Sequence, residues 1–183
     1  MIGLLGGAFD PPHVGHVALA DAAEAQLGLE RVVVVVVAEP GHKRVHASAD
    51  TRLALARAAF PGREVELDDH ARTVDMLRES SWRNPVFLIG ADEFAGFPDW
   101  KEPDAVLELA CLGVASRPGY SRDRLDRVLA GLSRPDRVRF FEIEPVPVSS
   151  SEIRERVAAA EPIDGLVPPA VAAEIAGRGL YRG

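Results

Sequence analysis

Two histidines near the amino terminus stand in a stretch whose residue types suit phosphate binding. The stretch reads Gly6-Gly7-Ala8-Phe9-Asp10-Pro11-Pro12-His13-Val14-Gly15-His16. Its paired glycines let the backbone turn tightly and approach a ligand with no Cβ in the way. His13 and His16 are three residues apart, so on a helix they share one face beside the free N–H groups of the first turn. The stretch therefore predicts a phosphate-binding loop.

Two other interpretations of the same stretch stay open. It also fits an ordinary strand–turn–helix corner that carries two surface histidines. A zinc-binding pair is the second alternative, although no cysteine or acidic residue is suitably placed to complete the ligand set. Gly15, between the two histidines, leaves room for a flat group to lie against the helix.

A second group of polar residues stands near the other end of the chain. Ser149, Ser150 and Ser151 are followed by Glu152 and Arg154. Ser149 and Glu152 have the spacing of a capping box, which is a purely structural interpretation. A cap requires neither three successive hydroxyls nor an arginine one turn later. Hydroxyls, N–H groups at a helix start and a guanidinium together predict a second phosphate cradle.

Three further side chains follow apolar runs and have chemistry to offer. Lys43 would place a compact charge near a triphosphate, or it is a solvated turn lysine. Asp92, after Gly90 and Ala91, has oxygens that accept hydrogen bonds from a ribose diol, or it forms an Asx turn. Trp100 offers a flat face on which an aromatic or positively charged ring can stack, or it packs against other apolar groups.

The elements that must position these residues alternate along the chain. Apolar runs predict strands at Ile2–Leu5, Val32–Val37, Val65–Leu67, Val86–Ile89, Cys111–Ala115 and Val138–Ile143. Helical patterns fall at Val14–Ala25, Asp50–Phe60, Val74–Arg78, Ala105–Leu109, Arg122–Leu132, Glu152–Ala159 and Ala170–Arg178. This alternation predicts an α/β fold, a Rossmann-like doubly wound domain with a mainly parallel central sheet. Ligands of such sheets bind at the carboxyl ends of the strands, which makes 6–16, 38–46, 90–100 and 145–154 the candidate loops.

One of the predicted strands differs from the others. The run Val32–Val37 is valine throughout, whereas a strand with one wet face would alternate apolar and polar residues. We therefore expect it to lie inside the sheet, covered on both faces.

Composition limits the function classes. The length of 183 residues favours one domain, residues 1–183, and 47% hydrophobic residues are ordinary for a globular protein. Lysine and arginine total 21 against 28 acidic residues, a net charge of −7, which argues against a nucleic-acid binder. Cys111 is the single cysteine, and the longest apolar run is far shorter than the roughly 20 residues of a membrane span. With no basic leader at Met1, we expect a cytoplasmic protein that does not bind a membrane.

The first stretch resembles the signature of the nucleotidyltransferase superfamily with a His-x-Gly-His motif. Its form, Gly-Gly-x-Phe-Asp-Pro-x-His-x-Gly-His, is most similar to bacterial nicotinate-mononucleotide adenylyltransferases. Four later segments follow the same family in the same order: Pro40-Gly41-His42-Lys43, the run 71–77 with matches at Thr73, Asp75 and Leu77, Ile89-Gly90-Ala91-Asp92 with Trp100 downstream, and Val148-Ser149-Ser150-Ser151-Glu152-Ile153-Arg154. Thr73 also has the alternative of a plain helix cap.

The resemblance implies adenylyl transfer from ATP to nicotinate mononucleotide, with deamido-NAD and pyrophosphate as products. It assigns catalytic roles to His13, His16, Lys43 and Arg154. It assigns ATP contacts to Gly6, Gly7, Phe9, Gly15, Gly90, Asp92, Ser149, Ser150 and Ser151. It assigns acceptor contacts to Ala8, Thr73 and Trp100.

The same resemblance implies that Mg²⁺ enters with ATP, because few carboxylates are placed to hold it independently. The partners are ATP and a pyridine mononucleotide, and homo-oligomers occur in the family. Two alternatives stay open. The first is a related adenylyl- or cytidylyltransferase that acts on nicotinamide mononucleotide or phosphopantetheine, and the second is a non-catalytic nucleotide-binding module on this fold.

Overall fold

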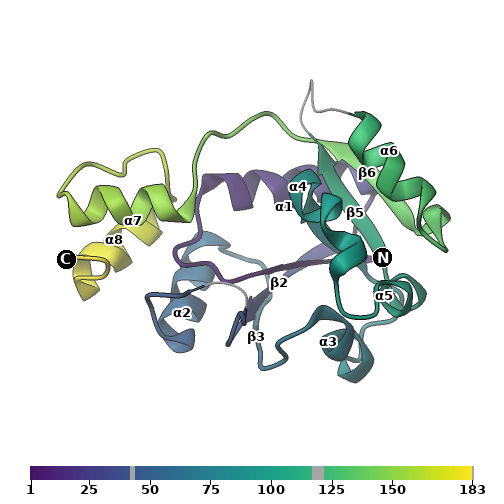
Figure 1. Ribbon diagram of the computed structural model, residues 1–183. Coiled ribbons are helices and arrows are strands. Elements are labelled where there is room, and N and C mark those ends of the chain that lie inside the picture. The colour runs from purple at the N-terminus through teal and green to yellow at the C-terminus, as the bar shows by residue number, and fades with distance from the viewer. Residues whose placement is uncertain (42–43, 117–121, 183) are drawn as a thin grey trace.

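A computed structural model describes residues 1–41, 44–116 and 122–182 of the chain. Its centre is a six-stranded sheet in the order β3-β2-β1-β4-β5-β6, and every neighbouring pair of strands is parallel (Figure 1). The strands are β1 (Ile2–Gly7), β2 (Arg31–Val37), β3 (Val65–Asp68), β4 (Val86–Gly90), β5 (Cys111–Ser116) and β6 (Val138–Glu142). The expected parallel α/β sheet is confirmed.

The valine-rich strand β2 lies between β1 and β3, as its composition predicts. Successive side chains of a strand point to opposite faces of the sheet. Val32, Val34 and Val36 accordingly belong to one apolar core, while Val33 and Val35 belong to the other. All five are 1% exposed or less, so this strand has no wet face.

Helices cover both faces of the sheet. The helices are α1 (Val14–Leu27), α2 (Ala49–Ala59), α3 (Thr73–Glu79), α4 (Ala91–Ala95), α5 (Pro103–Leu109), α6 (Arg122–Ala130), α7 (Ser150–Ala158) and α8 (Pro169–Arg178), with short 3₁₀ turns η1 (Phe97–Asp99) and η2 (Pro135–Arg137). Buried residues of α1, α2, α7 and α8 share the core that contains Val34. Those of α3, α4, α5 and α6 share the core that contains Val35. This arrangement is the doubly wound fold that the alternation predicts.

The structure contains two short helical elements after β4 that the sequence does not predict. The segment after β4 forms α4 and η1, where the sequence predicts only a loop at 90–100. Helix α4 has five residues, too few to show a helical period, yet Phe94 and Phe97 are fully buried. Across the described part of the chain, no helix is long and apolar enough to cross a membrane.

The strand order fixes where a ligand can bind. From β1 the chain continues to β2 and β3 on one side, and β4 then returns to the other side of β1. The connections after β1 and β4 therefore leave the sheet in opposite directions, which opens a crevice at their carboxyl ends. Helix α8 packs against α2 at this end of the molecule (Figure 1).

Candidate active site

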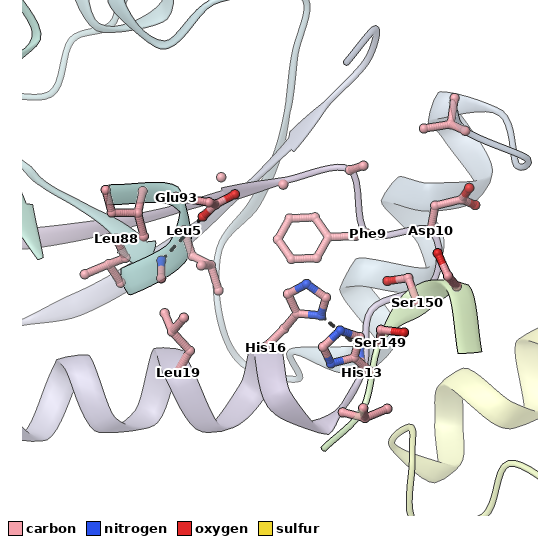
Figure 2. A pocket seen from close by; sticks show the side chains of 18 of the residues that line it. Leu5, Phe9, Asp10, His13, His16, Leu19, Leu88, Glu93, Ser149 and Ser150 are labelled. Atoms are coloured by element: carbon pink, nitrogen blue, oxygen red, sulfur yellow. Dashed lines mark hydrogen bonds between the residues drawn. The ribbon is translucent and has the colours of Figure 1, made fainter. Parts of the chain in front are cut away.

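A cavity of about 570 Å³ lies at the carboxyl ends of β1 and β4 (Figure 2). Four regions line it: the loop after β1 with the start of α1, the loop after β2, the end of β4 with the start of α4, and the start of α7. Its lining residues are Leu5, Gly6, Gly7, Ala8, Phe9, Asp10, His13, His16, Leu19, Arg44, Val45, Leu88, Ile89, Gly90, Glu93, Val148, Ser149, Ser150, Ser151 and Arg154. The size falls within the range of pockets that bind small molecules.

The two imidazoles lie against each other at the start of α1. His13 is the residue that precedes the helix and His16 is in its first turn, with ring centroids 3.7 Å apart. The backbone N–H of His13 donates to Nδ1 of His16 at 3.1 Å. Because Nδ1 accepts this bond, a neutral His16 carries its proton on Nε2. The sequence predicts that the two histidines share a face, and the structure confirms that they are neighbours.

Burial determines the charge state of His13. It lowers the pKa of His13 from 6.5 to about 4, so the imidazole is neutral near pH 7. Among the described residues, its Nδ1 is the one buried side-chain nitrogen or oxygen without a hydrogen-bond partner. A Cβ at Gly15 would lie 3.1 Å from that Nδ1. The flat group that Gly15 accommodates is thus the His13 ring itself, and Nε2 remains for a ligand.

The start of α7 forms the opposite wall. Ser149 caps the helix by accepting the N–H of Glu152 at 3.1 Å, so half of the predicted capping box is present. Ser150 donates to the carbonyl of Pro11 at 2.8 Å. The Arg154 guanidinium donates to the Asp10 carbonyl at 2.7 Å and to the Ser151 hydroxyl at 3.1 Å. This helix start is therefore joined directly to the histidine loop.

The buried side chain of Asp10 anchors the loop that carries the histidines. Its side chain is only 4% exposed, and its carboxylate accepts the N–H groups of His46 at 2.6 Å and Ala47 at 3.2 Å. It also accepts the phenol of Tyr181 at 2.8 Å. A buried carboxylate is stable only when its oxygens are bonded in this way.

Arg52 joins the same buried region from α2. It is 1% exposed and donates to four backbone carbonyls, those of Ala8, Val37, Ala38 and Ala47, at 2.6–3.1 Å. Burial lowers the pKa of Arg52, while the nearby charge of Asp10 opposes that shift. The guanidinium stays protonated, since arginine does not lose its proton in proteins. Arg52 thereby ties the loop after β1 to the loop after β2.

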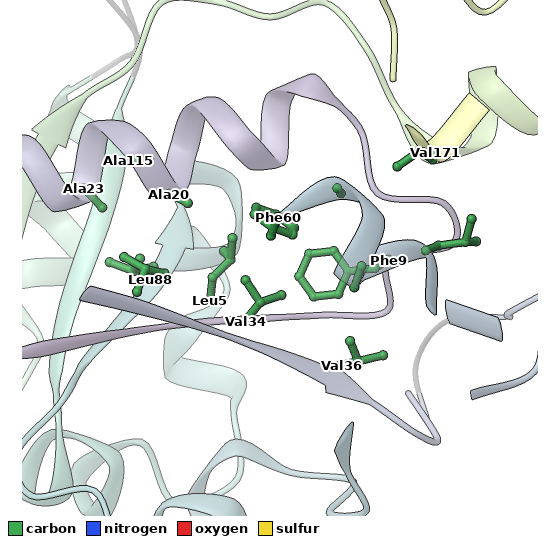
Figure 3. Packing of buried hydrophobic residues seen from close by; sticks show 14 of the residues in the cluster. Leu5, Phe9, Ala20, Ala23, Val34, Val36, Phe60, Leu88, Ala115 and Val171 are labelled. Carbon is green, nitrogen blue, oxygen red and sulfur yellow. The ribbon is translucent and has the colours of Figure 1, made fainter. Parts of the chain in front are cut away.

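Phe9 both packs in the apolar core and lines the cavity. Its backbone is left-handed, with φ of 52°, and its ring is 2% exposed. Figure 3 shows the ring inside the apolar core near Val36 and Phe60, and its centroid lies 5.1 Å from that of His16. The ring therefore supports His16 from the core side while one edge reaches the cavity.

Comparisons with known proteins place the chain in a family. Residues 4–156 match the family model described as cytidylyltransferase-like. A probable nicotinate-nucleotide adenylyltransferase of Rubrobacter xylanophilus is 38% identical over 199 residues, covering 99% of this chain and 92% of the relative. The protein of the same name from Bordetella avium is 38% identical over 192 residues, covering 99% and 98%. This chain belongs to the nicotinate-nucleotide adenylyltransferase family.

A solved structure shares the fold of this family member. The nicotinic acid mononucleotide adenylyltransferase of Plasmodium falciparum, solved in complex with NaAD, aligns with a TM-score of 0.74 at 18% identity. The alignment covers 98% of this chain and 96% of that one. The same enzyme, in complex with APC, aligns with a TM-score of 0.71.

Most side chains that the family resemblance selects meet at the cavity. Those that line it are Gly6, Gly7, Ala8, Phe9, His13, His16, Gly90, Ser149, Ser150, Ser151 and Arg154. Gly15 lies behind His13, as described above. Lys43 lies outside the described residues.

Three selected side chains do not line this cavity. Asp92 is exposed in the first turn of α4, and the neighbouring Glu93 reaches the cavity instead. Thr73 is the first residue of α3, with Arg72 before it at the cap position, so the interpretation of Thr73 as the cap is wrong. Trp100 packs edge-on against Phe87 and Phe97 at the border of the core.

Sequence reasoning missed several residues that build or line the site. Among them are Asp10, Arg44, Val45, Arg52 and Glu93. Arg52 did leave a signal, because 52, 55, 56 and 59 form the buried stripe of α2, and a charge stands at one of these core positions. For Asp10 the partners are 36 to 171 residues away, which no local pattern reveals.

Proposed function

We propose that this chain transfers the adenylyl group of ATP to nicotinate mononucleotide, giving deamido-NAD and pyrophosphate. The observation that carries the proposal is the meeting of His13, His16 and Arg154 at one cavity on the crevice between β1 and β4. The names of the relatives, and the NaAD bound in the Plasmodium enzyme, support the same reaction.

The reaction needs alignment more than acid–base chemistry. An oxygen of the mononucleotide phosphate attacks the α-phosphorus of ATP in line, and pyrophosphate leaves as the bond from that phosphorus to the bridging oxygen breaks. The attacking phosphate is already an anion, so no side chain has to act as nucleophile or strong base. The protein must hold the two phosphates in line and stabilise the negative charge that grows on the α-phosphate and the leaving group.

We assign that stabilisation to groups on the two walls of the cavity. His16, with its proton on Nε2, donates to the α-phosphate, and Nε2 of His13 contacts the adjoining phosphates. Arg154 balances the leaving pyrophosphate together with Lys43, and Arg44 adds a third positive charge beside them. The hydroxyls of Ser149–Ser151 and the backbone around Gly90 complete the ATP contacts, with Asp92 nearby for a ribose. Ala8, Thr73 and Trp100 are our candidates for the acceptor side.

The described residues do not form a magnesium site of their own. No group of three or more histidine, cysteine, aspartate or glutamate side chains that could hold a metal occurs among them. The carboxylate of the histidine loop, Asp10, is used by two backbone N–H groups and a phenol. We propose that Mg²⁺ arrives bound to the triphosphate, and that residues 1–183 work as one cytoplasmic domain.

The decisive experiment replaces His16 by alanine and measures pyrophosphate release with ATP and nicotinate mononucleotide. We expect wild type to turn over and His16→Ala to lose about 10²- to 10³-fold in kcat, the usual cost of one donor to a developing oxyanion. Arg57→Met, at an exposed position in the last turn of α2 that does not line the cavity, is the control and should keep its activity. Equal turnover of His16→Ala and wild type would refute the assignment.

An acceptor panel separates this reaction from its alternatives. Nicotinate mononucleotide, nicotinamide mononucleotide and phosphopantetheine are assayed side by side with ATP. A preference for either of the other two would move the chain to a related transferase. ATP binding by calorimetry without pyrophosphate release from any acceptor would mean a non-catalytic nucleotide-binding module.

A further inference from the structure

The last residues of the chain reach the loop that carries the histidines. Helix α8 is held to the core by Val171 and Ile175, which are 2% exposed or less. It ends at Gly179, whose left-handed φ of 62° stops the helix, and the N–H of Leu180 bonds back to the carbonyl of Ile175. Tyr181 is left-handed too, with φ of 61°. This termination returns the chain to the protein, where the phenol meets Asp10 at 2.8 Å.

The phenol remains a hydrogen-bond donor throughout the working pH range. Burial, the bond to Asp10 and the charge of that carboxylate all raise the pKa of Tyr181, well above that of a free tyrosine. It therefore stays neutral and donates its proton to Asp10, a bond between a neutral donor and a charged acceptor, which is stronger than one between neutral groups.

Through Asp10, the hydrogen bond from Tyr181 is connected to two loops of the site. It stands three residues before His13, and its own carbonyl is held by Arg154. Its carboxylate also fixes the N–H groups of His46 and Ala47, which end the loop that carries Arg44 at the cavity. The histidine loop and the loop after β2 thus share one buried carboxylate, and the phenol holds one of its two oxygens.

We propose that Tyr181 is a positioning residue of this enzyme, acting through Asp10 to set the histidine loop and the Arg44 loop relative to each other. The proposal rests on the proposed function. Tyr181 does not line the cavity, so it touches no reactant. Its effect is on alignment, which governs the rate of an in-line transfer much more than it governs ATP affinity.

The test is Tyr181→Phe, which removes one hydroxyl and keeps the ring. We expect kcat to fall about tenfold while KM for ATP changes less than twofold, the signature of an effect on the transition state. Calorimetry should still give one ATP per chain, which shows that the fall is not a loss of folded protein. Arg178→Ala, which breaks the exposed ion pair with Glu174 on the same helix, is the control and should retain wild-type kcat.

Asp10→Asn and the double variant sharpen the test. If the pair acts as a unit, the double variant is no slower than Asp10→Asn alone. Unchanged kcat in Tyr181→Phe overturns the proposal, whether or not Asp10→Asn folds. So does a kcat that falls only in proportion to the calorimetric stoichiometry, because that is a purely structural role.

Hydrogen exchange distinguishes failure of this proposal from failure of the proposed function. In Tyr181→Phe we expect faster exchange at the amides of His46 and Ala47, with unchanged exchange at Val34 in β2. That measurement needs no substrate. If wild type releases no pyrophosphate but the two amides respond, the reaction assignment has failed and the coupling stands. If wild type is active and neither kcat nor exchange responds, the coupling has failed.

Discussion

Two segments at the carboxyl ends of the strands, which we call the two rims of the site, are held in place by different kinds of side-chain contact. The loop after β1 rests on the buried side chains of Asp10 and Arg52 and on the half-buried Tyr181, and these contacts bond it to segments up to 171 residues away. The segment after β3, residues 69–79 at the proposed acceptor side, is held mainly by pairs of exposed or partly exposed side chains. These are Asp75 with Lys101, Arg78 with Glu102, and His70 with Glu79, while the buried Asp68 at the end of β3 also contacts His70.

The difference has a physical consequence. A buried charge that loses its partner cannot be solvated by water, so the native geometry is strongly enforced. An exposed pair exchanges its partner for water at little cost and is screened by salt. The comparison indicates that the proposed phosphate side is fixed in advance and that the proposed acceptor side is free to adjust. Three measurements test this contrast.

The largest effect should come from Arg52→Met, which keeps the bulk of the side chain and removes the guanidinium. Four backbone carbonyls in two loops then lose their donor, and Asp10 loses a nearby positive charge. We expect the free energy of unfolding to fall by about 3–5 kcal/mol, the usual cost of breaking a buried charged group from its partners. Urea unfolding monitored by circular dichroism measures it.

The same helix supplies the control. Arg57 is an exposed arginine in the last turn of α2, and Arg57→Met should change the unfolding free energy by about 0.5 kcal/mol or less. Similar losses in Arg52→Met and Arg57→Met would remove the distinction between the two rims.

The second effect concerns His13 and pH. Its folded pKa of about 4 lies below the unfolded value of 6.5, so its stabilising contribution is complete above pH 6.5. That contribution is lost as the pH falls toward 4, because the unfolded chain takes up the proton first. Between about pH 7.5 and pH 5 we expect wild type to lose about 2 kcal/mol more stability than His13→Gln.

Comparison with the glutamine variant isolates His13, since all other titrating groups are common to both proteins. Urea midpoints at the two pH values measure the difference. If the two proteins lose stability in parallel, His13 titrates normally in the folded state and the phosphate side is more open than its burial indicates.

The sequence determined the sheet well and the supports of the site poorly. Strands such as β2 and β4 are continuous apolar runs, and the helices that flank β2, α1 and α2, are long enough to show a period. The confirmed neighbours, His13 and His16, lie within one short motif. Motif spacing is local, so it survives without any knowledge of tertiary contacts.

What the sequence could not reveal depends on contacts between distant segments. The roles of Asp10 and Tyr181 exist only because the fold brings residues 171 positions apart together. Glu93 replaces Asp92 at the cavity because the unforeseen helix α4 turns the neighbouring side chain toward it. The sequence predicts that the loop after β2 borders the site, but nothing in the sequence indicates that the side chain of Arg44 lines the cavity.

The smallest expected effect concerns His70, in the segment after β3. Like the residue of the second prediction it is a histidine, but its pKa is shifted in the opposite direction. His70 lies 2.6 Å from Asp68 and 3.1 Å from Glu79, and bonds to these carboxylates raise its pKa above 6.5. Its contribution is therefore complete below the unfolded value and is lost as the pH rises through the folded pKa. Because the ring is partly exposed, we expect His70→Gln to cost only about 0.5 kcal/mol or less near pH 5.5.

At alkaline pH, well above the raised folded pKa of His70, the variant and wild type should be equally stable, since the imidazole of wild type is then neutral. Glu79→Gln is the matched variant, because it removes the more exposed carboxylate and leaves Asp68 in place. Urea midpoints at the two pH values, in low and in high salt, measure the difference, and salt should abolish it. A loss at acid pH as large as that from His13, and insensitive to salt, would show that this rim is as rigidly built as the phosphate side, because only desolvated charges interact so strongly.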